Sequence, residues 1–205
     1  MRLLSFYIYT KYIFIIKSIP VIHLPFFTTI AQCRIMIAIQ FMNIYHPIVE
    51  EITNLLTRSG VWFETFIHPP VLTSEEAAQV RPGYTLNQGA KALIVKIEDS
   101  EKINTFCMFV LPAHLRLDSK RAKKMLNTKN LRFATENEID TVTSGVKRGA
   151  IPPFGNLFKI KVYADPQLFE NEKMVFNAGD RSFSVAMNTA DFKTIVQPHV
   201  LTIAE

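Results

Sequence analysis

The segment AKALIVKIEDSEKINTFCMFVLP, residues 90–112, gives the clearest evidence of the fold. It contains two apolar runs, Ala90 to Ile97 and Asn104 to Leu111, that are separated by a polar stretch. Both runs are rich in β-branched and aromatic residues, which favour strands. The polar connection predicts that the two strands pair antiparallel.

Helices and further strands are predicted on both sides of this pair. Residues 47–58 have apolar side chains at helical spacing, with Pro47 suited to the first turn and Gly60 to the stop. Capping boxes begin at Thr73 and Thr135. The other expected elements are strands at 61–67, 157–163 and 182–187 and helices at 118–126 and 191–196.

These elements follow one another without a strict strand–helix–strand rhythm. That order favours an α+β fold, with a mixed, largely antiparallel sheet and flanking helices, over a doubly wound fold. The chain has 205 residues, which is enough for one domain with an appendage. We therefore predict a single domain at 43–205, preceded by a separate leader at 1–42.

The leader differs from the rest of the chain in charge. Of the 23 basic residues, four lie in the leader, which has no acidic residue. The domain therefore has 19 basic and 18 acidic residues and is nearly neutral. The basic balance of the whole chain therefore says little about nucleic acid. The four are Arg2, Lys11, Lys17 and Arg34.

Several interpretations of the leader remain open. A membrane span is interrupted by Pro20 and Pro25, and a secretory signal lacks a clear cleavage site of small residues. A transit peptide would be richer in Arg and Ser. The leader is then a membrane-associating segment, an unclassified extension, or translated upstream sequence with the true start at Met36 or Met42.

The sequence lacks the common motifs of enzymes. It has no nucleophile elbow, no P-loop, no dinucleotide-binding glycine pattern and no H-E-x-x-H. The histidines and cysteines have no ligand spacing, so neither a metal nor a cofactor is expected. Cys107 lies inside an apolar strand and is interpreted as a core residue. His68, which precedes two prolines, is either a site residue or a turn residue.

Lys91 is a cation near the start of an apolar strand. Strand alternation places it on the face of Leu93, Val95 and Ile97, while Lys96 falls on the other face and is expected to be solvated. Buried lysines are rare without a partner or a function. Lys91 is either a functional residue or a side chain that reaches solvent from the strand end.

A second feature is the loop SGVKRGAIPPFGN, residues 144–156, which has three glycines and two adjacent prolines. Glycine permits a close backbone approach to a ligand. Pro152 and Pro153 lack N–H groups and fix φ, so they can hold carbonyl groups in a rigid array. The loop is either the backbone wall of a pocket or a tight connection into the next strand.

In their order along the chain, these landmarks resemble the YbaK and prolyl-tRNA editing family of aminoacyl-tRNA deacylases. The similarity covers residues 43–205. It rests on the segments GVWFETFIHPPVLTSEEAA (60–78), GAKALIVK (89–96), VLPAHLRLDSKRAKKMLNTKNLRFA (110–134) and SGVKRGAIPPFG (144–155), and on the tail 176–191 with its FNAG stretch. The leader has no counterpart. The resemblance implies the family's barrel-like α+β fold.

The resemblance also implies an activity, the hydrolysis of the ester that joins a wrong amino acid to tRNA. The family's essential lysine maps to Lys91, and its G-x-x-x-P loop maps to residues 149–153, with Gly149 and Pro153 as its defining positions. Lysine would hold the tRNA terminus, the loop backbone would position the aminoacyl group, and a water aided by the ribose hydroxyl would attack. The expected substrate contacts are His68, Ala150, Ile151, Pro152, Phe154 and Gly155.

The expected protein is thus a trans-acting, cytoplasmic hydrolase for a small mischarged amino acid. Aminoacyl-tRNA is its partner and a synthetase is a second candidate partner, whereas a membrane is not expected. The alternative is a non-catalytic module of the same fold that binds tRNA or a synthetase. The only dense basic stretch, Lys120 to Lys124, either contacts the tRNA backbone or forms a solvated helix face. The edited amino acid and the oligomeric state stay open.

Overall fold

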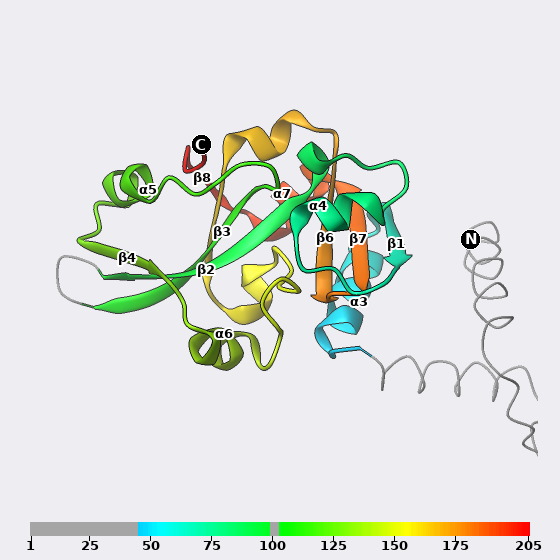
Figure 1. The fold of residues 1–205 in the computed structure, drawn as a ribbon, viewed down its shortest axis with the longest axis horizontal. Helices are drawn as coiled ribbons and strands as arrows, with labels where there is room; N and C mark the ends of the chain where they lie inside the picture. Colours follow the sequence, from blue (N-terminus) through cyan, green and yellow to red (C-terminus); the bar gives the residue numbers. More distant parts are fainter. Residues whose placement is uncertain (1–44, 99–102) are drawn as a thin grey trace, which may run out of the picture. The chain divides into compact units, whose positions relative to one another are not determined.

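The computed structural model describes residues 45–98 and 103–205 (Figure 1). The helices are α3 (Ile48–Arg58), α4 (Ser74–Gln79), α5 (Ser119–Leu126), α6 (Glu136–Thr143) and α7 (Thr189–Val196). The strands are β1 (Phe63–Ile67), β2 (Ala90–Glu98), β3 (Asn104–Pro112), β4 (Asn130–Phe133), β5 (Lys161–Ala164), β6 (Lys173–Asp180), β7 (Phe183–Asn188) and β8 (His199–Val200). Short 3-10 helices are η1 (Leu86–Gln88), η2 (Gly155–Phe158) and η3 (Pro166–Glu170).

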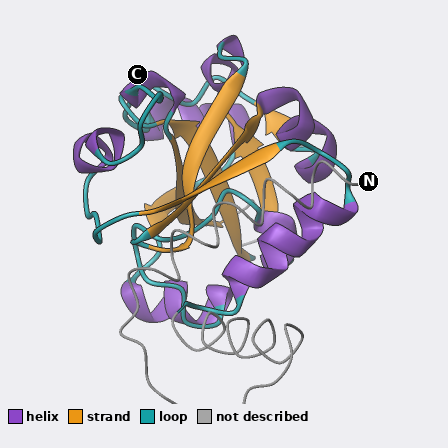
Figure 2. Ribbon diagram, turned by 90° about the vertical axis from the view of Figure 1, so that its right-hand side faces the viewer, coloured by secondary structure: helices purple, strands orange, loops and turns teal. Residues whose placement is uncertain are grey.

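The strands form two sheets, of which the larger has the order β4-β2-β3-β5-β8 and the smaller β1-β7-β6. β2 and β3 are antiparallel over their whole length, while β3–β5 and β5–β8 are parallel. An isolated bridge between Gly89 and Val175 connects the sheets. Figure 2 shows the strands at the centre with helices around them. The predicted hairpin and the α+β class are confirmed.

The β2–β3 hairpin has a hydrophobic core on each of its faces. Ile94 and Met108 belong to a large cluster with residues of α3, β6 and β7. Val95 and Phe109 face a second cluster that includes Ala122 of α5. Because both faces are covered, the strands are apolar almost throughout and show little of the alternation of a half-exposed sheet. The hairpin is therefore a fixed central element from which side chains at its ends can be positioned.

Helix ends follow local sequence signals. The Thr73 hydroxyl accepts a hydrogen bond from the Glu76 N–H at 3.1 Å, and the Glu76 carboxylate accepts one from the Thr73 N–H at 3.3 Å. Thr135 and Glu138 form the same reciprocal pair at 3.3 and 2.9 Å. Both predicted capping boxes are confirmed.

The strand predicted at 157–163 is only partly correct. Residues 155–158 form η2, and the strand itself is confined to Lys161–Ala164. The cause is a tight turn: a Cβ on Gly155 would lie 2.5 Å from Cγ2 of Val162. The chain passes this closely over its own next strand because Lys159 adopts a left-handed conformation with φ of 57°.

Other elements were not predicted at all, namely β4, β6 and β8. β6 is interrupted by an irregularity in its pairing with β7 between Asn177 and Asp180, where Gly179 has φ of 102°. That irregularity hides the strand pattern in the sequence. The predictions for the leader lie outside the described residues. Within 45–98 and 103–205, no helix is both long and apolar enough to cross a bilayer.

Candidate functional site

Lys91 is the second residue of β2 and lies opposite Leu111 on β3. Its Nζ donates to the carbonyl oxygen of Ala113 at 3.0 Å. An ammonium has three N–H donors, so this bond leaves two for another partner. Among the described residues, no carboxylate lies within 4.0 Å of this Nζ. Lys91 thus retains both charge and hydrogen-bonding capacity.

The surroundings of Lys91 change its electrostatics. Burial is the main reason that its pKa lies below the usual value; the Glu75 carboxylate opposes this shift and the Arg116 cation adds to it. Its strand neighbours Leu93 and Ile97 pack against the second core cluster, so the predicted face is confirmed. Lys91 therefore stands at the edge of a buried surface, where a charge interacts more strongly than in water.

The other lysine of β2 has a different environment. Lys96 Nζ lies 3.2 Å from the Glu138 carboxylate, which also binds Arg132 at 2.7 Å. Its side chain is 25% exposed, so the prediction of a solvated residue is wrong. The cause is α6, which brings Glu138 over the strand end. Lys96 is thereby neutralised within the fold.

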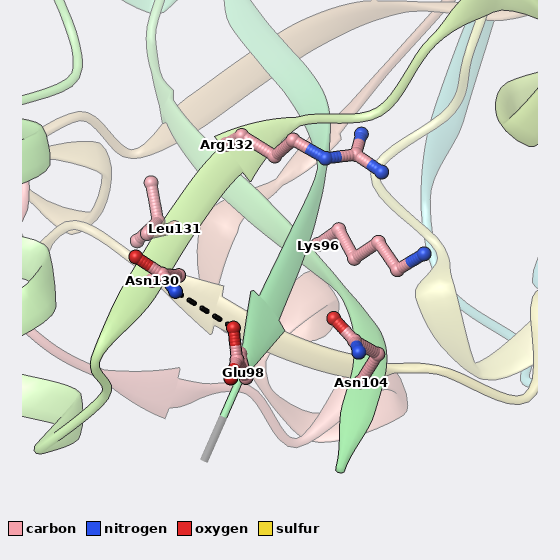
Figure 3. A pocket seen from close by; sticks show the side chains of 6 residues that line it. All are labelled: Lys96, Glu98, Asn104, Asn130, Leu131 and Arg132. Atoms are coloured by element: carbon pink, nitrogen blue, oxygen red, sulfur yellow. Dashed lines mark hydrogen bonds between the residues drawn. The ribbon is translucent and has the colours of Figure 1, made fainter. Parts of the chain in front are cut away.

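A hollow of about 300 Å³ adjoins Lys96 (Figure 3). Its walls come from the ends of β2, β3 and β4, and in Figure 3 Asn130 is hydrogen-bonded to Glu98. The lining residues are Lys96, Glu98, Asn104, Asn130, Leu131 and Arg132. Since its cations are already paired with Glu138, this hollow offers little free charge to a ligand.

The G-x-x-x-P loop runs from the surface into the core. Gly149 is exposed and has φ of 85°, a conformation that glycine tolerates best. Ala150, Ile151, Pro152 and Pro153 are all buried. The loop is therefore a packed segment that begins with a glycine, whose backbone can adopt this conformation.

The end of the loop is part of the large core. Phe154 is fully buried, and its ring centroid lies 5.6 Å from that of Phe176 and 5.8 Å from that of Phe192. Gly155 packs against Val162. These contacts hold the loop; the role of Phe154 and Gly155 as substrate contacts stays a prediction.

Three successive carbonyl groups at the loop entrance are bound by the β6–β7 region. The Arg148 carbonyl accepts from Arg181 at 2.7 and 3.0 Å, and the Gly149 carbonyl accepts from Nδ2 of Asn177 at 2.7 Å. The Ala150 carbonyl accepts from the Gly179 N–H at 2.8 Å. The loop is thus tied down along one side.

The next three carbonyl groups, those of residues 151–153, are different. No group in the described part of the chain donates to them. Backbone carbonyl groups almost always have a hydrogen-bond partner when they are buried. Their role as acceptors for a bound ligand stays a prediction.

His68 follows β1 and is buried. Its Nδ1 lies 2.9 Å from the Pro69 carbonyl and its Nε2 lies 2.7 Å from the Ser184 hydroxyl. Burial is the main cause that lowers the pKa of His68; the nearby Arg81 cation also lowers it, while the Pro69 bond and Asp180 oppose the change. His68 is linked to the loop only indirectly, because Ser184 in turn donates to Asn177.

The segment before and at the start of α4 connects the two main features. The Leu72 carbonyl lies 3.9 Å from where a Cβ on Gly149 would be, and the Glu75 charge acts on Lys91. Beside Gly149 there is also a hollow of about 430 Å³. It is lined by Glu136, Asn137, Ile139, Asp140, Val146, Lys147, Arg148 and Arg181.

Sequence reasoning missed Asn177, which bonds to the loop, and Arg81 and Ser184, which bond to Asn177. Arg81 had no recognisable signal, since it lies in a turn before Pro82. Asn177 is within the FNAG stretch that contributed to the resemblance, which was a usable signal. As for Cys107, it is 2% exposed, and burial raises the pKa of its thiol to about 12, as expected of a core residue.

Comparisons with known proteins show the family of the chain. Residues 68–195 match the family of the aminoacyl-tRNA editing domain. The chain belongs to the aminoacyl-tRNA editing family. The match contains Lys91 and the whole G-x-x-x-P loop, so both features fall within the family's domain. The resemblance inferred from the sequence is confirmed.

The relatives include a curated enzyme and solved structures. The multifunctional Ser/Thr-tRNA deacylase ProXp-y of Escherichia coli strain K12 is 35% identical over 148 residues, which cover 72% of this chain and 87% of the relative. A solved candidate trans-editing enzyme for prolyl-tRNA synthetase superposes with a TM-score of 0.66 at 21% identity, over 78% of this chain and 98% of that one. A scaffold protein used for computational epitope grafting gives 0.67 at 20% identity, over the same shares. The two structures support the fold.

Proposed function

We propose that this protein is a trans-acting deacylase that hydrolyses mischarged aminoacyl-tRNA, with seryl- and threonyl-tRNA as its first candidate substrates. The observation that carries the proposal is the environment of Lys91, a half-buried ammonium that no described carboxylate neutralises. An editing site must bind a polyanion, and an ammonium with hydrogen-bond donors to spare meets that need. The name of the curated relative supports the two amino acids.

Lys91 is assigned to the tRNA terminus. Its ammonium pairs with a phosphate of the 3′ end, using the donors that Ala113 leaves free. Arg116 adds positive charge nearby. This pairing fixes the ester relative to the loop, and positioning of this kind supplies a large part of the rate for an ester that is already activated.

The loop is assigned to the aminoacyl group. The carbonyl oxygens of residues 151–153 accept hydrogen bonds from its α-ammonium, and Gly149 allows the close approach. A water oxygen then forms a bond to the ester carbonyl carbon, the bond to the ribose oxygen breaks, and the amino acid leaves as a carboxylate. The ribose oxygen takes up one proton of that water and becomes a free hydroxyl, and the other proton passes to solvent as the acid ionises, so charge and atoms balance. Because the loop holds these carbonyl groups in place, they bind the ammonium without reorganising.

An editing role explains why such an enzyme is needed. A synthetase discriminates poorly between amino acids that differ by one methyl group or by an isosteric replacement, so a second site removes the errors. We place the reaction in the cytoplasm, where charged tRNA is used. A synthetase that releases the mischarged product is the second proposed partner.

The test is deacylation by the purified full chain of tRNAs charged with alanine, cysteine, serine, threonine or proline. Hydrolysis of seryl- and threonyl-tRNA, with the others spared, is the expected result. Hydrolysis of a tRNA charged with a different amino acid would support the proposed reaction but change its substrate. No hydrolysis of any substrate by a folded protein would overturn the proposal and favour a module that only binds tRNA or a synthetase.

A further inference from the structure

A cluster of four polar side chains lies directly behind the loop entrance. Arg81 donates from Nε to the Ser184 hydroxyl at 3.0 Å and from Nη2 to Oδ1 of Asn177 at 2.6 Å. Ser184 also contacts Nε2 of His68 at 2.7 Å. Asn177 then donates to the Gly149 carbonyl at 2.7 Å. The cluster therefore ends on the backbone of the G-x-x-x-P loop.

Arg81 is the unusual member of this cluster. It is only 6% exposed, and within the described ranges no carboxylate lies within 4.0 Å of its guanidinium. Burial lowers its pKa to about 10. A buried charge without an ion-pair partner is unfavourable for stability. A residue that served the core alone would be better replaced by an apolar side chain, so its polar contacts point to another role.

Its contacts determine the orientation of the Asn177 amide. A guanidinium only donates hydrogen bonds, so the atom of Asn177 that faces Arg81 must be the accepting Oδ1. The donating Nδ2 is then forced to the opposite side, toward the Gly149 carbonyl. The Ser184 hydroxyl donates to the same Oδ1 at 3.0 Å, so Arg81 and Ser184 together keep the amide oxygen turned away from the Gly149 carbonyl, which it would repel.

We propose that Arg81 and Asn177 are positioning residues for deacylation, which hold the Gly149 carbonyl and thereby set the shape of the loop that receives the aminoacyl group. This inference rests on the proposed function. Gly149 is the residue with φ of 85° at the loop entrance. The direction of its carbonyl group therefore sets the path of the backbone through residues 150–153. The Gly179 N–H holds the next carbonyl, that of Ala150, so these two bonds together anchor the start of the loop.

The consequence is a specificity effect as well as a rate effect. Seryl and threonyl groups differ by one methyl group, so a small shift of the loop wall changes their relative rates. Binding of tRNA through Lys91 does not depend on the Asn177 amide. Loss of the Asn177 bond should therefore lower kcat and change the seryl-to-threonyl ratio while KM stays nearly constant.

The test compares two Asn→Asp variants. Asn177→Asp keeps an acceptor for Arg81 but replaces the donor to Gly149 with an oxygen. Asn171→Asp is the matched control, because Asn171 also donates from Nδ2 to a backbone carbonyl, that of Asn87, at 3.2 Å. We expect Asn177→Asp to lower kcat roughly ten- to a hundredfold with a changed seryl-to-threonyl ratio, and Asn171→Asp to do neither.

The outcomes separate the two proposals. If the folded wild-type protein hydrolyses none of the five charged tRNAs, the proposed function fails. If the wild type is active and Asn177→Asp behaves like Asn171→Asp, the positioning role is overturned. Should Asn177→Asp not melt cooperatively, Arg81→Lys takes its place, since lysine keeps the charge but lacks the fork that holds Asn177. An unchanged substrate ratio in a folded Arg81→Lys protein would equally refute the inference.

Discussion

The two lysines of β2, Lys91 and Lys96, are the same residue type on one strand and have opposite roles in the fold. Lys96 is paired with Glu138 at 3.2 Å and lies 5.4 Å from the ring centroid of Phe106. Within the described ranges the Lys91 ammonium hydrogen-bonds to one neutral carbonyl and to no carboxylate, and burial lowers its pKa. The charge of Lys96 is therefore used within the protein, and that of Lys91 remains available to a ligand.

The comparison also shows why a hollow is a poor guide to this site. The hollow of about 300 Å³ lies beside Lys96, where every nearby cation has a partner. Lys91 lies at the opposite end of the strand, and no hollow among those described adjoins it. For a substrate as large as tRNA, free charge and free backbone acceptors matter more than an enclosed volume.

The largest expected effect comes from removing each lysine in turn. Lys91→Ala should lower kcat/KM for seryl-tRNA by about a hundredfold or more, because the substrate loses its charged anchor. Lys96→Ala should keep activity near wild type and show a lower melting temperature, since it breaks an internal ion pair. Deacylation rates and thermal melts measure both. Equal activity losses in the two variants would contradict the different roles assigned to Lys91 and Lys96.

A smaller loss is expected at the loop entrance. Gly149→Ala introduces a side chain at φ of 85° without a clash, since its nearest atoms would be 3.7 and 3.9 Å away. Gly83→Ala is the control, with φ of 84° and open space around it. Each change should cost about 1–2 kcal/mol of stability from backbone strain. Only Gly149→Ala should also lower kcat, by roughly tenfold.

The salt dependence of tRNA binding should show a smaller difference between Lys91 and Lys96. If Lys91 contacts one phosphate of the single-stranded terminus, Lys91→Ala reduces the slope of log affinity against log salt by about 0.7. Lys96→Ala should leave the slope unchanged. Titration of uncharged tRNA at several salt concentrations gives both values, and identical slopes for the two variants would argue against a phosphate contact at Lys91.

The smallest effect expected is in the pH dependence of stability. The pKa of His68 is lowered from 6.5, so the unfolded chain binds more protons, and stability falls as pH drops below about 6.5. Glu138 has a pKa lowered from 4.5, so its contribution is lost only below about that pH. Urea unfolding should therefore give a free energy of unfolding that rises with pH between 5 and 6.5, and His68→Gln should remove this rise. A slope that survives this substitution would assign the effect elsewhere.

Local signals in the sequence were sufficient for part of the fold. The capping boxes at Thr73 and Thr135 and the hairpin of β2 and β3 depend on residues close together in the chain. β4 depends on its distant partner β2, and β6 was hidden by the irregularity in its pairing with the adjacent β7. The close packing of Gly155 on Val162 converted the start of a predicted strand into η2. Such contacts leave no periodic pattern.

The same distinction applies to the site. Lys91 was identifiable because a cation in an apolar strand breaks its pattern, and the glycines and prolines marked the loop. Arg81 and Asn177 meet across 96 residues of sequence, so no local pattern connects them. Glu138 likewise reaches Lys96 from 42 residues away, which is why Lys96 was wrongly expected to be solvated.

The most direct test of the central claim is a single-turnover measurement with enzyme in excess over seryl-tRNA. Saturating enzyme removes the contribution of binding, so the rate constant reports whether the ester bond is broken at the site of Lys91. We predict rapid hydrolysis by the wild type and by Lys96→Ala, and hydrolysis by a folded Lys91→Ala protein that is slower by about a hundredfold. Hydrolysis by Lys91→Ala at the wild-type rate would contradict the account.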